Sequence, residues 1–232
     1  MPLTHTTFDF PFDRGYWYSL KELTNFEHEL SLARDQDIQL KDDLRLAQKP
    51  WMKLRNEELC PLRHFARHTH LADNTQFKIC PEGAEVDLEL KDEKSTRKLQ
   101  VTLAGPIWTP ENPNWGYSNK RSMEKLNREG ATSGWGPFRK EPDGSISNRE
   151  EVISTEERDK PYFDGLVKTL QNKQNFRIPD CDLIINAVAY CEAMNQNTFV
   201  SLANKALSTI HLKNFRTVYI LDYDDGYFVE QT

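Results

Sequence analysis

Apolar residues recur at helical spacing over the first predicted element. From Leu20 to Ala33 they return every three or four residues, which places them on one face of a helix. Ser19 stands just before this segment and Glu22 follows three residues later, the spacing of a capping box in which each residue satisfies a backbone N–H group of the other. The pattern therefore predicts a helix that begins after Ser19.

Glu27 interrupts the apolar face of this helix. It falls between Leu23 and Leu30 at the same helical spacing, so its carboxylate is directed toward the core side. Because burial of an unpaired charge is costly, we expect Glu27 to have a partner. The alternative is that Glu27 lies at the edge of the apolar face, where its carboxylate reaches solvent or pairs with an arginine.

Shorter helical segments and alternating segments follow. Helices are predicted at residues 37–48, 51–59 and 61–70. Strands are predicted at residues 77–80, 85–90 and 98–104, where apolar and polar residues alternate. The C-terminal part predicts, in order, a helix at 161–174, a strand at 181–190, a helix at 199–211, and strands at 217–222 and 227–230.

Strands that alternate with helices indicate an α/β fold, with a mixed central sheet flanked by helices and the continuous apolar strands in its middle. The 232-residue chain fits a single domain covering residues 1–232. Residues 105–155 differ in character, since Gly, Pro, Asn and Trp dominate them around one short helical piece. We expect this segment to be an ordered insertion within the domain.

The predicted insertion carries positive charge, although the whole chain has a formal charge of −6. Between Trp115 and Lys140, six lysines and arginines stand against two glutamates, a local balance of +4. Such cations can contact phosphates and tryptophan can stack on a base, whereas an Ω-like loop packed by its own aromatic residues is the alternative. The candidate nucleic-acid binding residues are Lys120, Arg121, Lys125, Arg128, Trp135, Arg139 and Lys140.

Composition is typical of a globular protein. Hydrophobic residues make up 38% of the chain and charged residues 28%. No apolar run approaches the roughly 20 residues that a membrane span requires. The four cysteines are widely spaced without a CxxC pair, unlike a secreted disulfide framework. We therefore expect reduced thiols, a cytoplasmic location and no membrane partner.

Several kinds of site are disfavoured by the motifs. Cys60, His64 and His68 would share one helix face, but a span of eight residues is a rise of about 12 Å, too long for all three to bind one zinc ion. Two of them could still contribute to such a site. There is no P-loop, no GxSxG nucleophile elbow and no GxGxxG motif after a strand.

The acidic hairpin carries the strongest candidate chemistry. Strand alternation places Asp87 on one face of the first strand together with Glu85 and Glu89. It places Gln100 and Thr102 on one face of the second strand. The twelve residues between Asp87 and Gln100 fit a hairpin that brings these side chains together. Mg²⁺ takes oxygen ligands of this kind, so the pattern predicts a metal site, with a merely solvated polar face as the alternative.

This layout resembles the PD-(D/E)xK nuclease superfamily, which has the restriction-endonuclease-like fold. In that family an Asp ends or interrupts one strand and an E-x-K or Q-x-K tripeptide lies on the next, with a Glu-bearing helix before them and a crossover helix and apolar strand after them. The resemblance implies that Asp87 is the motif Asp, Gln100 the Gln of the tripeptide and Glu27 the helix-borne Glu. These residues would then hold Mg²⁺ or Mn²⁺.

Thr102 stands where the family has its lysine. Some members carry that lysine on the following helix, where this chain offers Lys168 and Lys173, and Lys173 is the preferred candidate. The resemblance thus implies a metal-dependent nuclease that cleaves phosphodiester bonds in nucleic acid, DNA before RNA. The implied catalytic residues are Asp87, Gln100, Lys173 and Glu27.

Two other readings stay open at this point. A nuclease-like domain that has lost catalysis would serve as a nucleic-acid or protein binding module. An unrelated α/β protein with a polar hairpin would share the pattern without either function. Restriction-like folds often work as dimers, so the resemblance also implies a homodimer.

Overall fold

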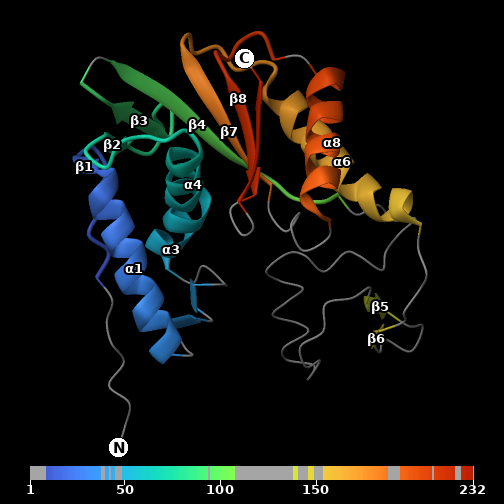
Figure 1. Ribbon diagram of the computed structural model, residues 1–232, viewed down its shortest axis with the longest axis horizontal. Helices are drawn as coiled ribbons and strands as arrows, with labels where there is room; N and C mark the ends of the chain where they lie inside the picture. Colours follow the sequence, from blue (N-terminus) through green and yellow to red (C-terminus); the bar gives the residue numbers. More distant parts are fainter. Residues whose placement is uncertain are drawn as a thin grey trace, which may run out of the picture.

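The computed structural model describes residues 9–37, 40–41, 43–44, 49–93, 95–107, 138–140, 146–148, 154–187, 194–210, 212–222 and 226–231. Over these residues the fold is mixed α/β, with helices on both faces of a seven-stranded sheet (Figure 1). The predicted fold class, a mixed central sheet flanked by helices, is confirmed.

The central sheet has the strand order β1-β2-β3-β4-β7-β8-β9. Its strands are β1 (Trp17–Ser19), β2 (Gln76–Ile79), β3 (Leu88–Lys91), β4 (Thr96–Ala104), β7 (Cys181–Ala187), β8 (Val218–Asp222) and β9 (Tyr227–Gln231). Strands β1 to β4 are antiparallel neighbours, whereas β4, β7 and β8 run parallel and β9 is antiparallel to β8. The two parallel connections each need a crossover, which helices supply.

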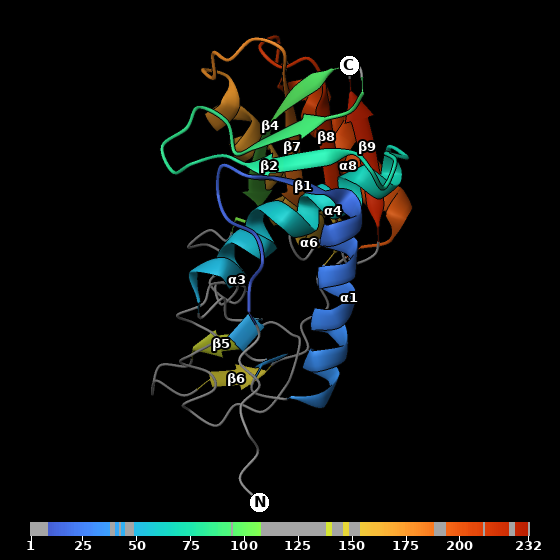
Figure 2. The same cartoon turned by 90° about the vertical axis from the view of Figure 1, so that its left-hand side faces the viewer.

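The helices divide between the two faces of the sheet. They are α1 (Leu20–Gln36), α3 (Pro50–Leu54), the π-helix η1 (Arg55–Leu59), α4 (Cys60–His68), α6 (Thr155–Lys173) and α8 (Gln196–Thr209). Helices α1, α3 and α4 lie on one side of the strands and α6 and α8 on the other (Figure 1). Figure 2 shows α1 and α4 next to each other on their face, where they are in contact.

Strand β7 lies at the centre of the fold, and all of its residues are buried. Leu183 and Ile185 pack into the core formed with α6 and α8, while Ile184 packs into the core formed with α1 and α4. A strand covered on both faces has no solvated side, which explains why its sequence does not alternate between apolar and polar residues. Its two polar residues, Asp182 and Asn186, are buried as well.

Helix α1 begins as the sequence predicts. The Ser19 side chain accepts a hydrogen bond from the backbone N–H of Glu22, and the Glu22 carboxylate accepts one from the backbone N–H of Ser19 at 2.6 Å. This reciprocal capping box satisfies two N–H groups that the first helical turn would otherwise leave unpaired.

Helix α6 begins six residues before the predicted start at Pro161. Proline lacks the N–H group that a helix interior uses, so the sequence favours a boundary there. The structure instead continues the helix through Pro161, whose carbonyl also accepts a hydrogen bond from the backbone N–H of Ile107 at 2.9 Å. The helix ends at Lys173, on the side of the sheet that Gln100 faces.

Of the predicted insertion at 105–155, the structure describes its two ends and a two-stranded sheet. Strand β5 (Phe138–Lys140) pairs antiparallel with β6 (Ile146–Asn148). Among the helices that the structure describes, none combines the length and the apolar character needed to cross a membrane.

Candidate functional site

Asp87 lies directly before β3, at the point where this strand begins to pair with β4. Its backbone N–H donates to the carbonyl of Leu99 at 3.2 Å, and its carbonyl accepts from the N–H of Cys80 at 2.9 Å. The backbone of Asp87 is therefore fixed by neighbours on both sides, β2 and β4. A side chain on such a backbone has little freedom to leave its place.

Strand β4 presents alternate residues to the two faces of the sheet. Leu99 and Val101 pack into the core beneath α1 and α4. Gln100 and Thr102 alternate with them and are half-buried on the opposite face, toward α6. The predicted sharing of one face by Gln100 and Thr102 is confirmed.

The predicted meeting of Asp87 and Gln100 is also observed. The side-chain amide of Gln100 donates a short hydrogen bond to Oδ2 of Asp87. The same Oδ2 accepts from the backbone N–H of Val101 at 2.7 Å. Two donors from β4 thus orient the Asp87 carboxylate, and the second carboxylate oxygen takes part in neither bond.

The two acids expected beside Asp87 lie differently. Glu85 is exposed and precedes the strand, and Glu89 forms an ion pair with Lys78 on β2 at 2.6 Å. Asp87 is therefore the one acid of the three whose carboxylate has a described hydrogen bond to β4. The three acids predicted to share one face of the first strand therefore have different surroundings.

Lys173 is brought to Asp87 by the end of α6. Its ammonium is half-buried and lies 5.7 Å from the centre of the Phe176 ring. Burial lowers the pKa of Lys173, and the negative charge of Asp87 acts in the opposite direction. Burial raises the pKa of Asp87, and the Val101 N–H group and the Lys173 charge oppose that rise. The alternative, Lys168, is exposed on α6.

Glu58 supplies a second carboxylate near Asp87. It lies on η1, which packs against β4, and its side chain is 18% exposed. Its Oε2 atom is buried and has no hydrogen-bond partner among the described residues. Burial raises the pKa of Glu58 to about 7, with the charge of Arg14 opposing the rise and that of Asp87 adding to it.

Arg14 joins these groups from the segment before β1. Its Nη1 donates to the carbonyl of Cys80 at 2.7 Å, and its Nη2 lies 3.5 Å from Oε1 of Glu58. Its positive charge also acts on Asp87, where it opposes the rise in pKa caused by burial. We call these residues the Asp87 cluster, which consists of Arg14, Glu58, Asp87, Gln100 and Lys173.

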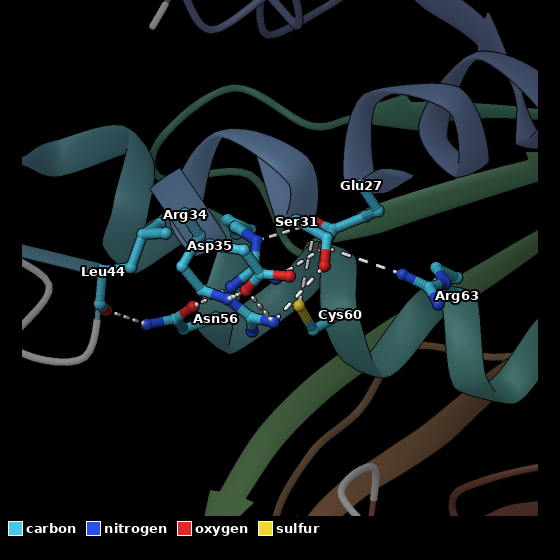
Figure 3. Close-up of polar contacts among 9 residues, drawn as sticks. Glu27, Ser31, Arg34, Asp35, Leu44, Asn56, Cys60 and Arg63 are labelled. Atoms are coloured by element: carbon cyan, nitrogen blue, oxygen red, sulfur yellow. Dashed lines mark hydrogen bonds and ion pairs between the residues drawn. The ribbon is translucent and has the colours of Figure 1, made fainter. Parts of the chain in front are cut away.

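Glu27 belongs to a different set of contacts. Its carboxylate, 3% exposed, accepts two hydrogen bonds from the Arg55 guanidinium at 2.8 and 2.5 Å. Nη1 of a second arginine, Arg63, lies 3.6 Å from Oε2 of Glu27, and the Cys60 thiol donates to Oε1 at 3.9 Å (Figure 3). The expected partner of Glu27 is thus an arginine, and the structure does not bring Glu27 to Asp87 and Gln100. The acid that the helical layer contributes to the cluster is Glu58.

Sequence patterns gave no signal for Glu58. The segment 51–59 has helical spacing, but the structure interrupts the α-helix with the π-helical residues of η1. A π-turn inserts an extra residue and rotates the faces that follow it, so spacing of 3.6 residues does not show which of Glu57 and Glu58 points inward. Such turns are frequent at functional sites, which agrees with the position of Glu58.

Two buried cysteines border the Asp87 cluster. Burial raises the pKa of Cys80 to about 11 and that of Cys181 to about 12. Both therefore remain neutral thiols near pH 7, and the thiolate is the form that binds metals and attacks electrophiles. The chemistry of the cluster rests on its oxygens and its two cations.

The donors of the Asp87 cluster fit a hard divalent cation. Asp87 and Glu58 offer carboxylate oxygens, one of them buried without a partner, and the Gln100 amide carries another oxygen. Within the described ranges, no group of three or more His, Cys, Asp and Glu side chains is arranged to hold a metal ion. Asp87 and Gln100, which are hydrogen-bonded to each other, are the residues best placed to hold such an ion, and Glu58 is near enough for the charge of Asp87 to raise its pKa.

Most of the predicted nucleic-acid binding residues lie outside the described part of the chain. These are Lys120, Arg121, Lys125, Arg128 and Trp135. Arg139 and Lys140 lie on β5, paired with Ser147 and Ile146 of β6. Their role in binding stays a prediction.

Comparisons with protein-family models, with curated proteins and with solved structures find no match to this chain.

Proposed function

We propose that this protein is a Mg²⁺- or Mn²⁺-dependent phosphodiesterase that acts on nucleic acid, with DNA as the first candidate substrate. The observation that carries the proposal is the hydrogen bond from Gln100 to Asp87, with Lys173 near enough for its charge to act on that carboxylate. A carboxylate, an amide and a lysine from two strands and the next helix are the groups that metal-dependent phosphodiester hydrolysis uses.

The order of the elements supports the same proposal. A helical layer with an inward acid at Glu58 precedes the β2–β3–β4 meander, and α6 then crosses over to β7, parallel to β4. The order of helix, hairpin, crossover helix and strand is the one expected from the resemblance to PD-(D/E)xK nucleases, although that resemblance assigned the helix-borne acid to Glu27. Lys173 on α6 is the candidate for the displaced catalytic lysine that the resemblance implies.

Each residue of the Asp87 cluster has a role in the proposed reaction. Asp87, Glu58 and Gln100 would hold the divalent ion, which when bound supplies a Lewis acid for a phosphoryl oxygen and lowers the pKa of a coordinated water. Lys173 would orient the attacking water and stabilise negative charge that develops on the phosphate. Arg14 would keep Glu58 in position through the contact at 3.5 Å.

Cleavage of labelled DNA and RNA by the purified chain tests the proposal. We expect cleavage with Mg²⁺ or Mn²⁺ and none with a chelator. Asp87→Asn should lower the rate by about 10²-fold or more, since it removes a charge at the reacting centre. The matched control is Glu89→Gln, because Glu89 lies two residues along and is paired with Lys78. Intact substrates with both cations would overturn the proposal.

A binding module without catalysis is the second candidate. Thr102 occupies the strand position of the family's lysine, and the described residues hold no set of three acids at ligand spacing. Binding of DNA or RNA without cleavage would favour this candidate.

A cytoplasmic location is proposed from the state of the cysteines. Cys60, Cys80 and Cys181 are free and buried, which is in keeping with a reducing cytoplasm. Assembly as a homodimer stays a prediction.

A further inference from the structure

A groove of about 390 Å³ opens beside the end of α6. One wall is the loop that leads from α6 into β7, and the other is the loop that leads into β8. The lining residues are Phe176, Arg177, Ile178, Pro179, Asp180, Lys213, Asn214, Phe215 and Arg216. Three cations and one carboxylate thus line a groove whose floor is partly aromatic.

Arg216 is the groove cation that pairs with a buried acid. Asp182 is fully buried and accepts hydrogen bonds from Arg216 at 2.9 and 2.5 Å. The same carboxylate also accepts from Arg97 at 3.1 and 2.7 Å, so one negative charge is shared by two arginines. Arg216 uses Nε and Nη2 for Asp182, and Nη1 takes part in neither bond. The triad keeps a net charge of +1.

Arg177 and Lys213 face the groove from opposite loops. Both are exposed, and Asp180 is the one acid in the lining. A polyanion would therefore meet two unburied cations and the outer part of Arg216. Guanidinium and ammonium groups spaced along a groove are the usual contacts of a phosphodiester backbone.

Hydrogen bonds connect the groove to Lys173 of the Asp87 cluster. The Asn214 side chain donates to the carbonyl of Lys173 at 2.9 Å and to that of Phe176 at 2.6 Å. The Phe176 ring stacks on Phe215 at 4.9 Å and lies under the Lys173 ammonium. The backbone N–H of Arg216 donates to the carbonyl of Cys181 at 2.9 Å. The groove and the candidate catalytic lysine therefore share one rigid support.

We infer that this groove binds the phosphodiester backbone of a nucleic-acid strand next to the phosphate presented to the Asp87 cluster. The inference rests on the proposed function for its substrate class and adds the surface that holds that substrate. It assigns backbone contacts to Arg177 and Lys213, residues that the sequence patterns did not single out. Because these contacts touch phosphates, they should be independent of base sequence.

The double variant Arg177→Gln/Lys213→Gln tests the inference. Arg216 is left unchanged because it partners buried Asp182. Binding of labelled single-stranded DNA, duplex DNA and RNA is measured by fluorescence anisotropy over a range of salt concentrations, with a chelator present to prevent cleavage. We expect affinity to fall about tenfold or more, and the slope of log affinity against log salt to become shallower by about one to two. Lys205→Gln, which changes an exposed lysine of α8, is the matched control.

The outcomes separate this inference from the proposed function. Unchanged affinity and salt slope in the double variant would overturn the inference, as would a wild-type chain that binds none of the three probes. A weakened double variant supports it, and the probe that loses most affinity identifies the strand type. If the wild-type chain binds through the groove but leaves the probes intact with Mg²⁺ and Mn²⁺, the proposed cleavage fails while the groove assignment holds.

Discussion

The side-chain amide of Gln100 donates a hydrogen bond to the carboxylate of Asp87 between two adjacent strands of the sheet. Because the amide nitrogen faces Asp87, the amide oxygen is the Gln100 atom left for another partner. The bond also opposes the effect of burial on the Asp87 carboxylate, whose pKa is raised. The hydrogen bond holds the two side chains together, and the Gln100 amide oxygen and the second Asp87 carboxylate oxygen are left as candidate metal ligands.

Gln100→Glu should make the folded state depend on a divalent cation. With a chelator, two carboxylates would face each other in a half-buried site, and we expect the free energy of unfolding to fall by about 1–2 kcal/mol at pH 8. Saturating Mg²⁺ should remove the loss, since a bound cation favours both ionised groups. Urea unfolding with and without Mg²⁺ measures the change. Gln76→Glu, at an exposed position of β2, controls for added charge. The same loss in both conditions would contradict the metal site.

Lys173→Met should reduce cleavage without preventing folding. The ammonium is half-buried near Asp87, and its loss removes charge stabilisation in the transition state, which typically costs about 10²–10³-fold in kcat. Lys168→Met removes an exposed lysine of the same helix and should leave kcat unchanged. Single-turnover kinetics on one DNA substrate compares the two. Equal rates for wild type and Lys173→Met would remove Lys173 from the mechanism.

Local patterns predicted the fold because each element carries its own signal. The capping box marks the start of α1, and the apolar run at 183–185 marks β7 as a strand buried on both faces. The hairpin brought Asp87 to Gln100 because strand alternation and the length of the connection together set the register. Such features depend on residues close together in the chain.

The rest of the site depends on contacts between distant segments. Glu27 and Glu58 both lie in the helical layer, and helical spacing alone favours Glu27 as the inward acid. The structure gives Glu27 an arginine partner, and it buries Glu58 on η1 close enough to Asp87 for that charge to raise the pKa of Glu58. Arg177 and Lys213 come together only when the loops before β7 and β8 are side by side. Periodicity in the sequence does not predict contacts between segments this far apart in the chain.

Glu58→Gln should change how stability depends on pH. In the folded state burial raises the pKa of Glu58 from 4.5 to about 7, so the folded protein binds this proton more tightly than the unfolded chain. Stability contributed by this group is therefore present at low pH and is lost as pH rises through about 5 to 7. Without a divalent cation, Glu58→Gln should be more stable than wild type by up to about 3 kcal/mol at pH 8 and by about 1 kcal/mol or less at pH 5.

Urea unfolding between pH 5 and pH 8 with a chelator measures this difference. The neighbouring Glu57→Gln is the matched control, because its side chain is 40% exposed and contacts Lys53 at 3.8 Å. A difference between Glu58→Gln and wild type that stays constant over this range would show that Glu58 does not titrate there.

Glu27→Gln should lower stability while leaving the response to divalent cations intact. The carboxylate is buried against Arg55 and Arg63, and loss of one partner of a buried ion pair costs about 3–5 kcal/mol, less where the new amide keeps one hydrogen bond. Thermal unfolding measures both quantities, and Glu29→Gln, exposed on the same helix, is the control. If Glu27 were a metal ligand instead, Glu27→Gln would abolish the rise in Tm caused by Mg²⁺, as Asp87→Asn is expected to do. Retention of that rise in Glu27→Gln, with its loss in Glu58→Gln, would establish Glu58 as the acid that the helical layer contributes to the site.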